Sequence, residues 1–385
     1  MLVWGVRGSF MITRVYIDNF RCFTNFEVRP DRVNLLIGDN GAGKSTFIEV
    51  LYRVVGLVVL GKAVEEAFPL NTLTRWDSRT TQQIEIDLSG SGGTYHYSLI
   101  LSHDLARETV TLQRETVKYN SLNDSRRLFL YDNGQVHLLN NEGKLGTQFP
   151  FRGTRSFLSQ LEARPENTLL TWFLDSLSKV WLIKLDPTSI DSESKIESES
   201  LHRDGSNFAS WYRHLSQERP EGLPKLFERL RKTVTGFRSL KTVSTGRGGQ
   251  KRELVAVVGH GDSEKTHEVY FNELSDGERA TIILYCLLMD AEGEPKTLLL
   301  DEPENFVGLQ LIQPWLVELG DAIRDEGQLF LISHHPEVID YLAADESLLF
   351  ERSGGGPARV RANPFDRDKG LKASELVARG LLDAR

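Results

Sequence analysis

The stretch that decides the fold of this chain is Gly38-Asp39-Asn40-Gly41-Ala42-Gly43-Lys44-Ser45. It satisfies the pattern G-x-x-x-x-G-K-[S/T] at every fixed position, which is the pattern of a phosphate-binding loop. The short, apolar residues 33–37 precede the loop and the helix-like residues 47–60 follow it, which gives the order strand, loop, helix. This context disfavours the alternative, a glycine-rich turn with an exposed lysine.

The residue types in this loop suit the binding of a nucleoside triphosphate such as ATP. Glycines let backbone N–H groups turn toward one anion, and the N-terminus of the following helix adds positive partial charge. Lys44 is expected to reach the β- and γ-phosphates, and the Ser45 hydroxyl is expected to ligate Mg²⁺. The nucleotide-binding residues that we expect here are Gly38, Asn40, Gly41, Gly43, Lys44, Ser45 and Thr46.

A second apolar run, residues 297–300, ends in the carboxylates Asp301 and Glu302. The run is too short for a helix and is typical of a buried parallel strand. Because ligands of open α/β sheets gather at the carboxyl ends of strands, we expect Asp301 to hold Mg²⁺ and Glu302 to orient and deprotonate the attacking water. Taken alone, the pattern does not distinguish a catalytic acid pair from a strand that ends in a polar loop.

Between these two motifs lies Leu274-Ser275-Asp276-Gly277-Glu278. Its serine and glutamate form a capping box that opens an apolar helix over residues 280–289, which is a common structural device. In this position, however, the stretch resembles the signature of the ATP-binding-cassette class, usually written Leu-Ser-Gly-Gly-Gln. The resemblance is to the SMC, RecF and OLD group of cassette-type ATPases, in particular to compact relatives without arms. It implies that Ser275 and Gly277 contact the γ-phosphate held by the opposite subunit of a homodimer that forms head to tail on ATP binding.

Two further stretches resemble the same group. Residues 12–23 are similar to its opening strand and Asn-Phe-Arg turn, which implies that Arg21 couples the nucleotide to the rest of the lobe. Residues 329–336 look like a buried strand that ends in polar residues, where the family places a γ-phosphate-sensing histidine, and His334 fits this role by its distance from Pro336. The alternative for the His-His pair, a metal site, has no Cys or second His cluster nearby in sequence to support it.

Other parts of the family pattern are less clear in this chain. Residues 303–309 lack the Asp or His that many relatives carry near the end of this loop. The glutamine expected to contact Mg²⁺ and water has no local motif, and Gln160 is preferred over Gln148 for it. No CxxC motif occurs, which removes the zinc hook by which some relatives join their arms.

The fold that the resemblance implies is α/β, an ABC-ATPase-like P-loop head with a mixed β-sheet lobe, a helical lobe and no long coiled coil. We expect a single head over residues 11–385, preceded by a tail, residues 1–10. Residues 11–150 and 236–385 would form the nucleotide-binding lobe and residues 151–235 a mainly helical lobe. Five β-forming runs separated by turn residues predict an antiparallel insertion in the first lobe, at residues 84–88, 94–101, 109–117, 127–131 and 135–139. Residues 186–200 alternate serine with acids, which is typical of a solvated loop.

Composition describes a soluble globular protein, since 40% of the 385 residues are hydrophobic and 26% are charged. Two cysteines, Cys22 and Cys286, suit packing as small apolar residues in a reducing cytoplasm. The longest apolar stretch without a charge, residues 54–60, falls far short of the roughly twenty residues that a membrane span needs. We therefore expect a cytoplasmic protein without membrane contact.

Charge and length bear on the biological role. The net charge of −8 gives no global attraction to nucleic acid, but residues 225–252 carry nine basic residues that could contact DNA or simply form a solvated surface. Two functions stay open: an ATPase in DNA repair or recombination, and a regulatory ATPase of a prokaryotic anti-phage defence system that controls a separate effector protein. A transporter head is a third alternative. Too few residues follow His334 for the Toprim nuclease domain of OLD proteins, so nuclease activity is not expected.

Overall fold

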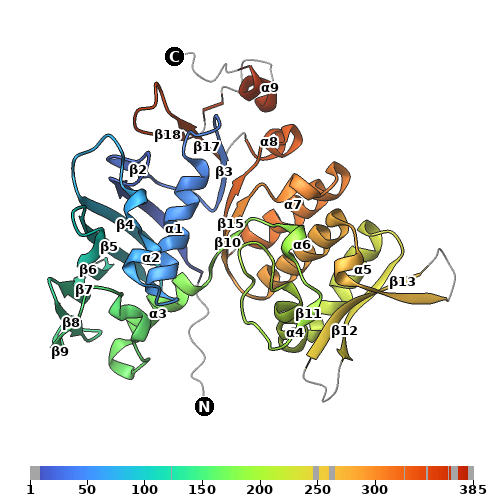
Figure 1. The fold of residues 1–385 in the computed structure, drawn as a ribbon, viewed down its shortest axis with the longest axis horizontal. Helices are drawn as coiled ribbons and strands as arrows, with labels where there is room; N and C mark the ends of the chain where they lie inside the picture. The colour runs from blue at the N-terminus through green and yellow to red at the C-terminus, as the bar shows by residue number, and fades with distance from the viewer. Residues whose placement is uncertain are drawn as a thin grey trace. The chain divides into compact units, whose positions relative to one another are not determined.

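The structure is a computed structural model that describes residues 9–122, 124–245, 251–259, 265–324, 326–343, 346–362, 364–365 and 372–379 (Figure 1). The chain divides into two compact units. Unit 1 comprises the described parts of Met1–Trp181, Lys296–Leu299 and Glu326–Arg385, and unit 2 those of Leu182–Pro295 and Leu300–Asp325. This division differs from the expected lobes, because residues 151–235 are shared between the units. Residues 1–8 of the expected tail lie outside the described residues.

An antiparallel sheet of eight strands forms much of unit 1. The strands are β1 (Met11–Asp18), β2 (Phe26–Val28), β4 (Thr81–Gly90), β5 (Gly93–Asp104), β6 (Thr109–Ser121), β7 (Asp124–Asp132), β8 (Gln135–Leu139) and β9 (Leu145–Pro150). Their order is β2-β1-β4-β5-β6-β7-β8-β9, and each neighbouring pair is antiparallel. All five predicted β runs fall inside these antiparallel strands, whereas their role as an insertion in a nucleotide-binding lobe stays a prediction.

Helix α3 (Thr168–Ser178) packs on this sheet through aromatic side chains. Trp172 stacks on Tyr95 with ring centroids 4.9 Å apart, and the Phe173 ring lies 5.9 Å from the rings of Tyr95 and Tyr97. Such pairs bury much apolar area and fix the helix to the strands beneath it. This packing explains why α3 belongs to unit 1 and not to a helical lobe that begins at residue 151.

The second sheet carries the phosphate loop. Strand β3 (Val33–Ile37) pairs in parallel with β16 (Gln328–Ile332) and β17 (Ser347–Glu351), and every residue of β3 and β16 is buried. Helix α1 (Lys44–Val58) follows β3, and its Phe47 ring lies 5.8 Å from the rings of Phe330 and Phe350. With β10 (Val180–Ile183), β15 (Thr297–Asp301) and β18 (Arg359–Ala362), the strand order is β10-β15-β16-β3-β17-β18. The remaining described α-helices of unit 1 are α2 (Val64–Ala67), α8 (Pro336–Leu342) and α9 (Ala373–Ala378).

Unit 2 combines helices with a small antiparallel sheet. Its helices are α4 (Phe208–Glu218), α5 (Leu223–Thr233), α6 (Asp276–Gly293) and α7 (Leu309–Arg324), and its strands are β11 (Glu193–Ser194), β12 (Phe237–Thr245), β13 (Lys251–Gly259) and β14 (Thr266–Tyr270). Helix α6 is the centre of this unit, since residues 280–291 are all buried. Trp315 of α7 is also buried and donates a hydrogen bond of 2.7 Å from Nε1 to the Leu284 carbonyl. At 18 residues, α6 is the longest described helix, which agrees with the absence of coiled-coil arms.

The expectation of a solvated loop over residues 186–200 is wrong for part of that segment. Ile190, Ser192 and Ser194 are buried, and β11 pairs with β13. The Ser192 carbonyl also accepts a hydrogen bond of 2.7 Å from the Leu254 backbone N–H. These contacts provide hydrogen-bond partners for the buried backbone of this segment. The serine-rich sequence by itself does not indicate that the segment is buried. Among the described residues, no helix combines the length and apolarity that a membrane span requires.

Candidate functional site

The phosphate loop in unit 1 depends on backbone geometry that only glycine adopts easily. Gly38, Gly41 and Gly43 have φ angles of 131°, 82° and 114°. A Cβ atom on Gly38 would lie 2.1 Å from the Phe350 carbonyl oxygen of β17, so the loop passes directly over the neighbouring strand. A Cβ on Gly43 would lie 3.1 Å from the Sγ atom of Cys22. The glycines therefore allow both the unusual φ angles and the close approach of the loop to its surroundings.

Helix α1 begins directly at this loop and suits the binding of an anion. Its N-terminus has no side-chain cap and no acidic residue in the first turn. Orphan N–H groups and the helix dipole at such an end favour phosphate. Lys44 is only 6% exposed, and its Nζ atom donates to the carbonyl oxygens of Gly38 at 2.6 Å and Asp39 at 3.0 Å. Ser45 is exposed and Thr46 is half-buried, so the Ser45 hydroxyl is accessible to a ligand.

The two cysteines behave as the composition suggests. Both are buried and form no disulfide. Burial raises the pKa of Cys22, whose thiol lies against the phosphate loop, and burial also raises the pKa of Cys286 inside α6. Neither is therefore activated as a thiolate nucleophile.

Arg21 lies in the turn between β1 and β2 of unit 1. Its φ angle is 47°, and its guanidinium makes two hydrogen bonds to Glu49 of α1, at 2.5 and 3.0 Å. Arg53 binds the same carboxylate, with Nη2 2.6 Å from Oε1. Sequence reasoning missed Glu49, although it lies on the helix that follows the loop. The role of Arg21 toward nucleotide stays a prediction.

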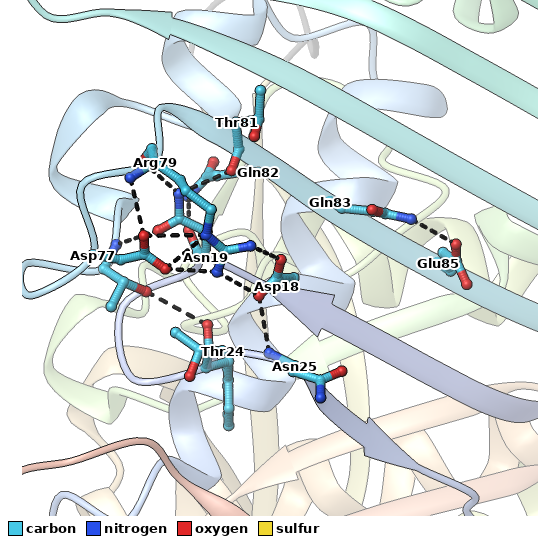
Figure 2. Close-up of polar contacts among 12 residues, drawn as sticks. Asp18, Asn19, Thr24, Asn25, Asp77, Arg79, Thr81, Gln82, Gln83 and Glu85 are labelled. Carbon is cyan, nitrogen blue, oxygen red and sulfur yellow. Dashed lines mark hydrogen bonds and ion pairs between the residues drawn. The ribbon is translucent and has the colours of Figure 1, made fainter.

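Polar contacts fix the turn that follows β1 (Figure 2). Asp18, the last residue of β1, accepts hydrogen bonds from the Arg79 guanidinium at 2.5 and 3.0 Å and from the Asn25 backbone N–H at 2.9 Å. The Asn19 side chain donates to two backbone carbonyls, one of them that of Arg79 at 2.7 Å. Asn19 and Asn25 both have positive φ angles, 57° and 48°. The network holds a strained turn in one conformation.

The structure separates the roles of the two adjacent histidines. His335 is the N-cap of α8, and its Nδ1 atom accepts a hydrogen bond of 3.2 Å from the Glu337 backbone N–H. His334 follows the end of β16 and is exposed. His335 therefore has a structural role, and the role of His334 toward the γ-phosphate stays a prediction.

The expectation that Gln160 contacts the ion held by Ser45 does not agree with the structure. Gln160 is the last, exposed residue of η2 (Phe157–Gln160). The preceding Ser159 lies 3.1 Å from where a Cβ on Gly61 would be, just beyond the C-terminal end of α1. Ser45 is in the first turn of the same helix, and a helix of 15 residues is about 22 Å long. A glutamine side chain cannot cover this length.

The acidic strand end belongs to unit 2. Asp301 is the last residue of β15 and is 3% exposed. Its Oδ2 atom accepts a hydrogen bond of 3.0 Å from Lys184 Nζ, whereas its buried Oδ1 atom has no hydrogen-bond partner among the described residues. A buried carboxylate oxygen without a partner is costly unless a cation completes the site. Asp301 therefore fits the role of a Mg²⁺ ligand.

Glu302, which follows Asp301, has a left-handed backbone with φ 53° and ψ 55°. This conformation is rare for a residue with a side chain and costs on the order of 1 kcal/mol. Asn305 of η7 (Pro303–Phe306) donates a hydrogen bond of 2.9 Å to Glu302 Oε2. Strained backbone at a carboxylate next to a metal-ligand candidate is typical of a functional position.

The signature stretch, also in unit 2, is confirmed as a capping box. Ser275 is the N-cap of α6, and its Oγ atom accepts from the Glu278 N–H at 3.4 Å while Glu278 Oε2 accepts from the Ser275 N–H at 2.9 Å. Ser275 is exposed. A Cβ on Gly277 would lie 2.9 Å from the Phe306 carbonyl at the end of η7. The signature glycine thus allows the helix to approach the loop that follows Glu302.

The basic segment 225–252 is largely compensated by acids within unit 2. Lys225, Arg229, Lys232, Lys241 and Lys251 each form an ion pair with a glutamate, at N–O distances from 2.5 to 2.8 Å. Residues 246–250, which include Arg247, lie outside the described residues. Because the acids offset much of the positive charge, this surface has a weaker electrostatic attraction to a polyanion than its sequence suggests.

Comparison with known proteins places the chain in a family. The family model described as "AAA domain, putative AbiEii toxin, Type IV TA system" matches residues 33–340. The chain belongs to this family. It is an ABC-type, SMC-like P-loop ATPase in fold, as the phosphate loop, the acidic strand end and the signature predicted. No curated protein matches it in sequence.

Solved structures agree with this assignment of fold. An SMC head bound to the C-terminal winged-helix domain of ScpA matches with a TM-score of 0.52 and 14% identity, covering 94% of this chain and 99% of the other. An SMC head with an extended coiled coil, bound to the C-terminal domain of ScpA and derived from Pyrococcus furiosus, matches with a TM-score of 0.50 and 10% identity, covering 97% and 98%. At these identities the likeness concerns the fold alone.

Proposed function

We propose that this protein hydrolyses ATP and that it does so as a homodimer in which each site is completed by the partner protomer. The observation that carries the proposal is the end of β15, where Asp301 has a buried carboxylate oxygen without a hydrogen-bond partner among the described residues and Glu302 follows in a left-handed conformation. The same chain has a complete phosphate loop at the start of α1. A phosphate loop, a metal-ligand carboxylate and a poised base are the elements of nucleotide hydrolysis.

In this proposal Lys44 holds the β- and γ-phosphates, and Ser45 and Asp301 hold Mg²⁺. Mg²⁺, when bound, neutralises phosphate charge and orients the triphosphate. Glu302 accepts a proton from the attacking water while the oxygen of that water bonds to the γ-phosphorus. The bond between the γ-phosphorus and the β–γ bridging oxygen breaks. ADP and phosphate are the products, and His334 stabilises the charge on the γ-phosphoryl group.

Ser275 and Gly277 act on the nucleotide of the partner. Support comes from the exposed position of Ser275 at the N-terminus of α6, a helix of 18 residues. ATP between the protomers would then add binding energy that favours the dimer, and hydrolysis would remove it. The ATP-bound dimer and the separated protomers would expose different surfaces, and a partner could distinguish the two states by this difference.

A mixing experiment tests the shared site directly. Lys44→Ala removes the phosphate contact of one protomer and Ser275→Ala removes the signature contact, so each variant alone should be inactive or nearly so. In an equal mixture, half of the dimers pair the two variants and retain one intact site of two, so about a quarter of wild-type turnover should return. If the mixture stays inactive while both variants remain folded by circular dichroism, the site is not shared between protomers.

We further propose that the cycle regulates a separate effector protein in a prokaryotic defence system. The glutamate pairing of the basic segment supports this over a DNA-repair ATPase, and the matched family description is compatible with it. Steady-state ATP turnover should therefore rise with protein concentration but change little on addition of linear duplex DNA. Strong stimulation by DNA would instead favour the repair or recombination function.

A further inference from the structure

Lys184 and Asp301 form an ion pair that the proposed chemistry does not use. The Nζ atom of Lys184 lies 3.0 Å from Asp301 Oδ2. The two side chains differ in environment, because that of Asp301 is 3% exposed and that of Lys184 is 44% exposed. A buried carboxylate needs a cation or several hydrogen-bond donors, and Lys184 is the cation that the described part of the chain supplies.

Hydrogen bonds hold the backbone of Lys184 and of the residues that follow it. It directly follows β10, and its backbone N–H donates to the Arg203 carbonyl at 2.8 Å. Asp186, two residues later, donates its N–H to the Asp204 carbonyl at 2.9 Å. The Pro187 carbonyl accepts a hydrogen bond of 2.6 Å from the Arg279 guanidinium of α6. Three contacts therefore hold the segment that presents the lysine to Asp301.

We propose that Lys184 is a resident counterion that occupies Asp301 until a divalent cation replaces it. The inference rests on the proposed role of Asp301 as a metal ligand. A compact ammonium group on a flexible, half-exposed stem can move into solvent when a metal ion takes its place, whereas Asp301 is held in the strand. Ammonium and metal cannot share one carboxylate without repulsion, because both are positive. Lys184 thus weakens metal binding in the absence of ATP and keeps Asp301 compensated between turnovers.

Titration of nucleotide-free, full-length protein with Mn²⁺ tests this, with free Mn²⁺ followed by its electron paramagnetic resonance signal. Lys184→Met removes the competing charge, and we expect it to bind Mn²⁺ about fivefold more tightly than wild type, a ratio that suits a partly exposed ion pair. Asp301→Asn in the Lys184→Met background should abolish the gain. Lys241→Met, which removes the lysine paired with Glu268 at 2.6 Å, is the matched control and should leave Mn²⁺ affinity unchanged.

Lys184→Gln covers the case in which Lys184→Met does not fold, since it keeps a hydrogen-bond donor while removing the charge. Equal Mn²⁺ affinity of wild type and the folded Lys184 variant, or a gain that survives Asp301→Asn, would overturn the proposal. So would a folded variant that binds no Mn²⁺ at millimolar concentration. The Mn²⁺ measurement does not depend on hydrolysis. A gain in Mn²⁺ affinity in the variant, with no ATPase activity in the wild-type protein, would refute only the proposed function. ATPase activity of the wild-type protein, with no gain in Mn²⁺ affinity in the variant, would refute only the counterion role of Lys184.

Discussion

Glu115 of β6 is a fully buried carboxyl group in the large sheet, and its ionisation should control stability near neutral pH. Tyr97 donates a hydrogen bond of 2.8 Å to Oε1, and Ser156 Oγ lies 2.9 and 2.8 Å from the two carboxyl oxygens. Burial raises the pKa of Glu115 from its ordinary value of 4.5 to about 7, against the lowering effect of these two hydroxyl donors. Glu115 is therefore largely protonated in the folded protein below this pH.

The sign and size of the effect follow from linkage. Below pH 4.5 both folded and unfolded states carry a neutral Glu115, so the carboxyl costs nothing. Between pH 4.5 and about 7 the unfolded state ionises and the folded state does not, so the free energy of unfolding falls as pH rises. At about 1.4 kcal/mol per pKa unit, the full loss is on the order of 3 kcal/mol. Above pH 7 both states are charged and the loss stays constant.

Glu115→Gln removes the titration while keeping an amide that can donate to and accept from Tyr97 and Ser156. We expect its stability relative to wild type to increase between pH 5 and pH 7.5 by up to about 3 kcal/mol. Urea unfolding followed by circular dichroism at several pH values measures this difference. Glu108→Gln, at an exposed position between β5 and β6, controls for the loss of one negative charge. A stability difference that stays constant across this pH range would refute the reasoning.

Three further predictions concern the proposed site. Gly38→Ala places a Cβ about 2.1 Å from the Phe350 carbonyl at φ 131°, so it should abolish binding of a fluorescent ATP analogue and lower the melting temperature; normal binding would contradict the loop geometry. Glu302→Gln should still bind ATP but hydrolyse it at least about 100-fold more slowly, and an ATP-bound dimer should accumulate in light scattering after gel filtration. Gly277→Ala, whose Cβ would lie 2.9 Å from the Phe306 carbonyl, should reduce turnover with little effect on ATP binding by the same protomer.

The parts of the fold that were predictable from sequence are those with local causes. Strand β3 was predicted at its observed bounds, because an apolar run before a glycine-rich loop has few alternatives. The strands of the large sheet were predicted because turn residues separate β-forming runs. The division into units was not predictable, because it depends on contacts such as Trp172 with Tyr95, which join residues far apart in sequence. Nothing local in residues 151–181 indicates that they pack on the sheet.

The residues of the candidate site also differ in how far the sequence alone predicts them. The phosphate loop, the acidic strand end and the capping box have fixed local spacing, whereas Lys184 meets Asp301 across 117 positions in the chain. The one indication of Lys184 in the sequence is its position directly after a short apolar strand. Asp301 likewise is the last residue of a short apolar strand. The assignment of Gln160 failed because no sequence motif of fixed spacing identifies this glutamine. Its distance from Ser45 follows only from the structure, where the neighbouring Ser159 lies beyond the end of α1.

The signature motif shows why a loss of activity alone cannot prove a shared site. Within its own protomer Ser275 caps α6, and Gly277 leaves room for the Phe306 carbonyl in the loop that follows the proposed base. Substitution of either residue could disturb that loop and so impair catalysis in cis, without any contact to a partner. Only the mixture of Lys44→Ala and Ser275→Ala protomers separates the two explanations, because an intact signature in one protomer can restore activity only if it reaches the phosphate loop of the other.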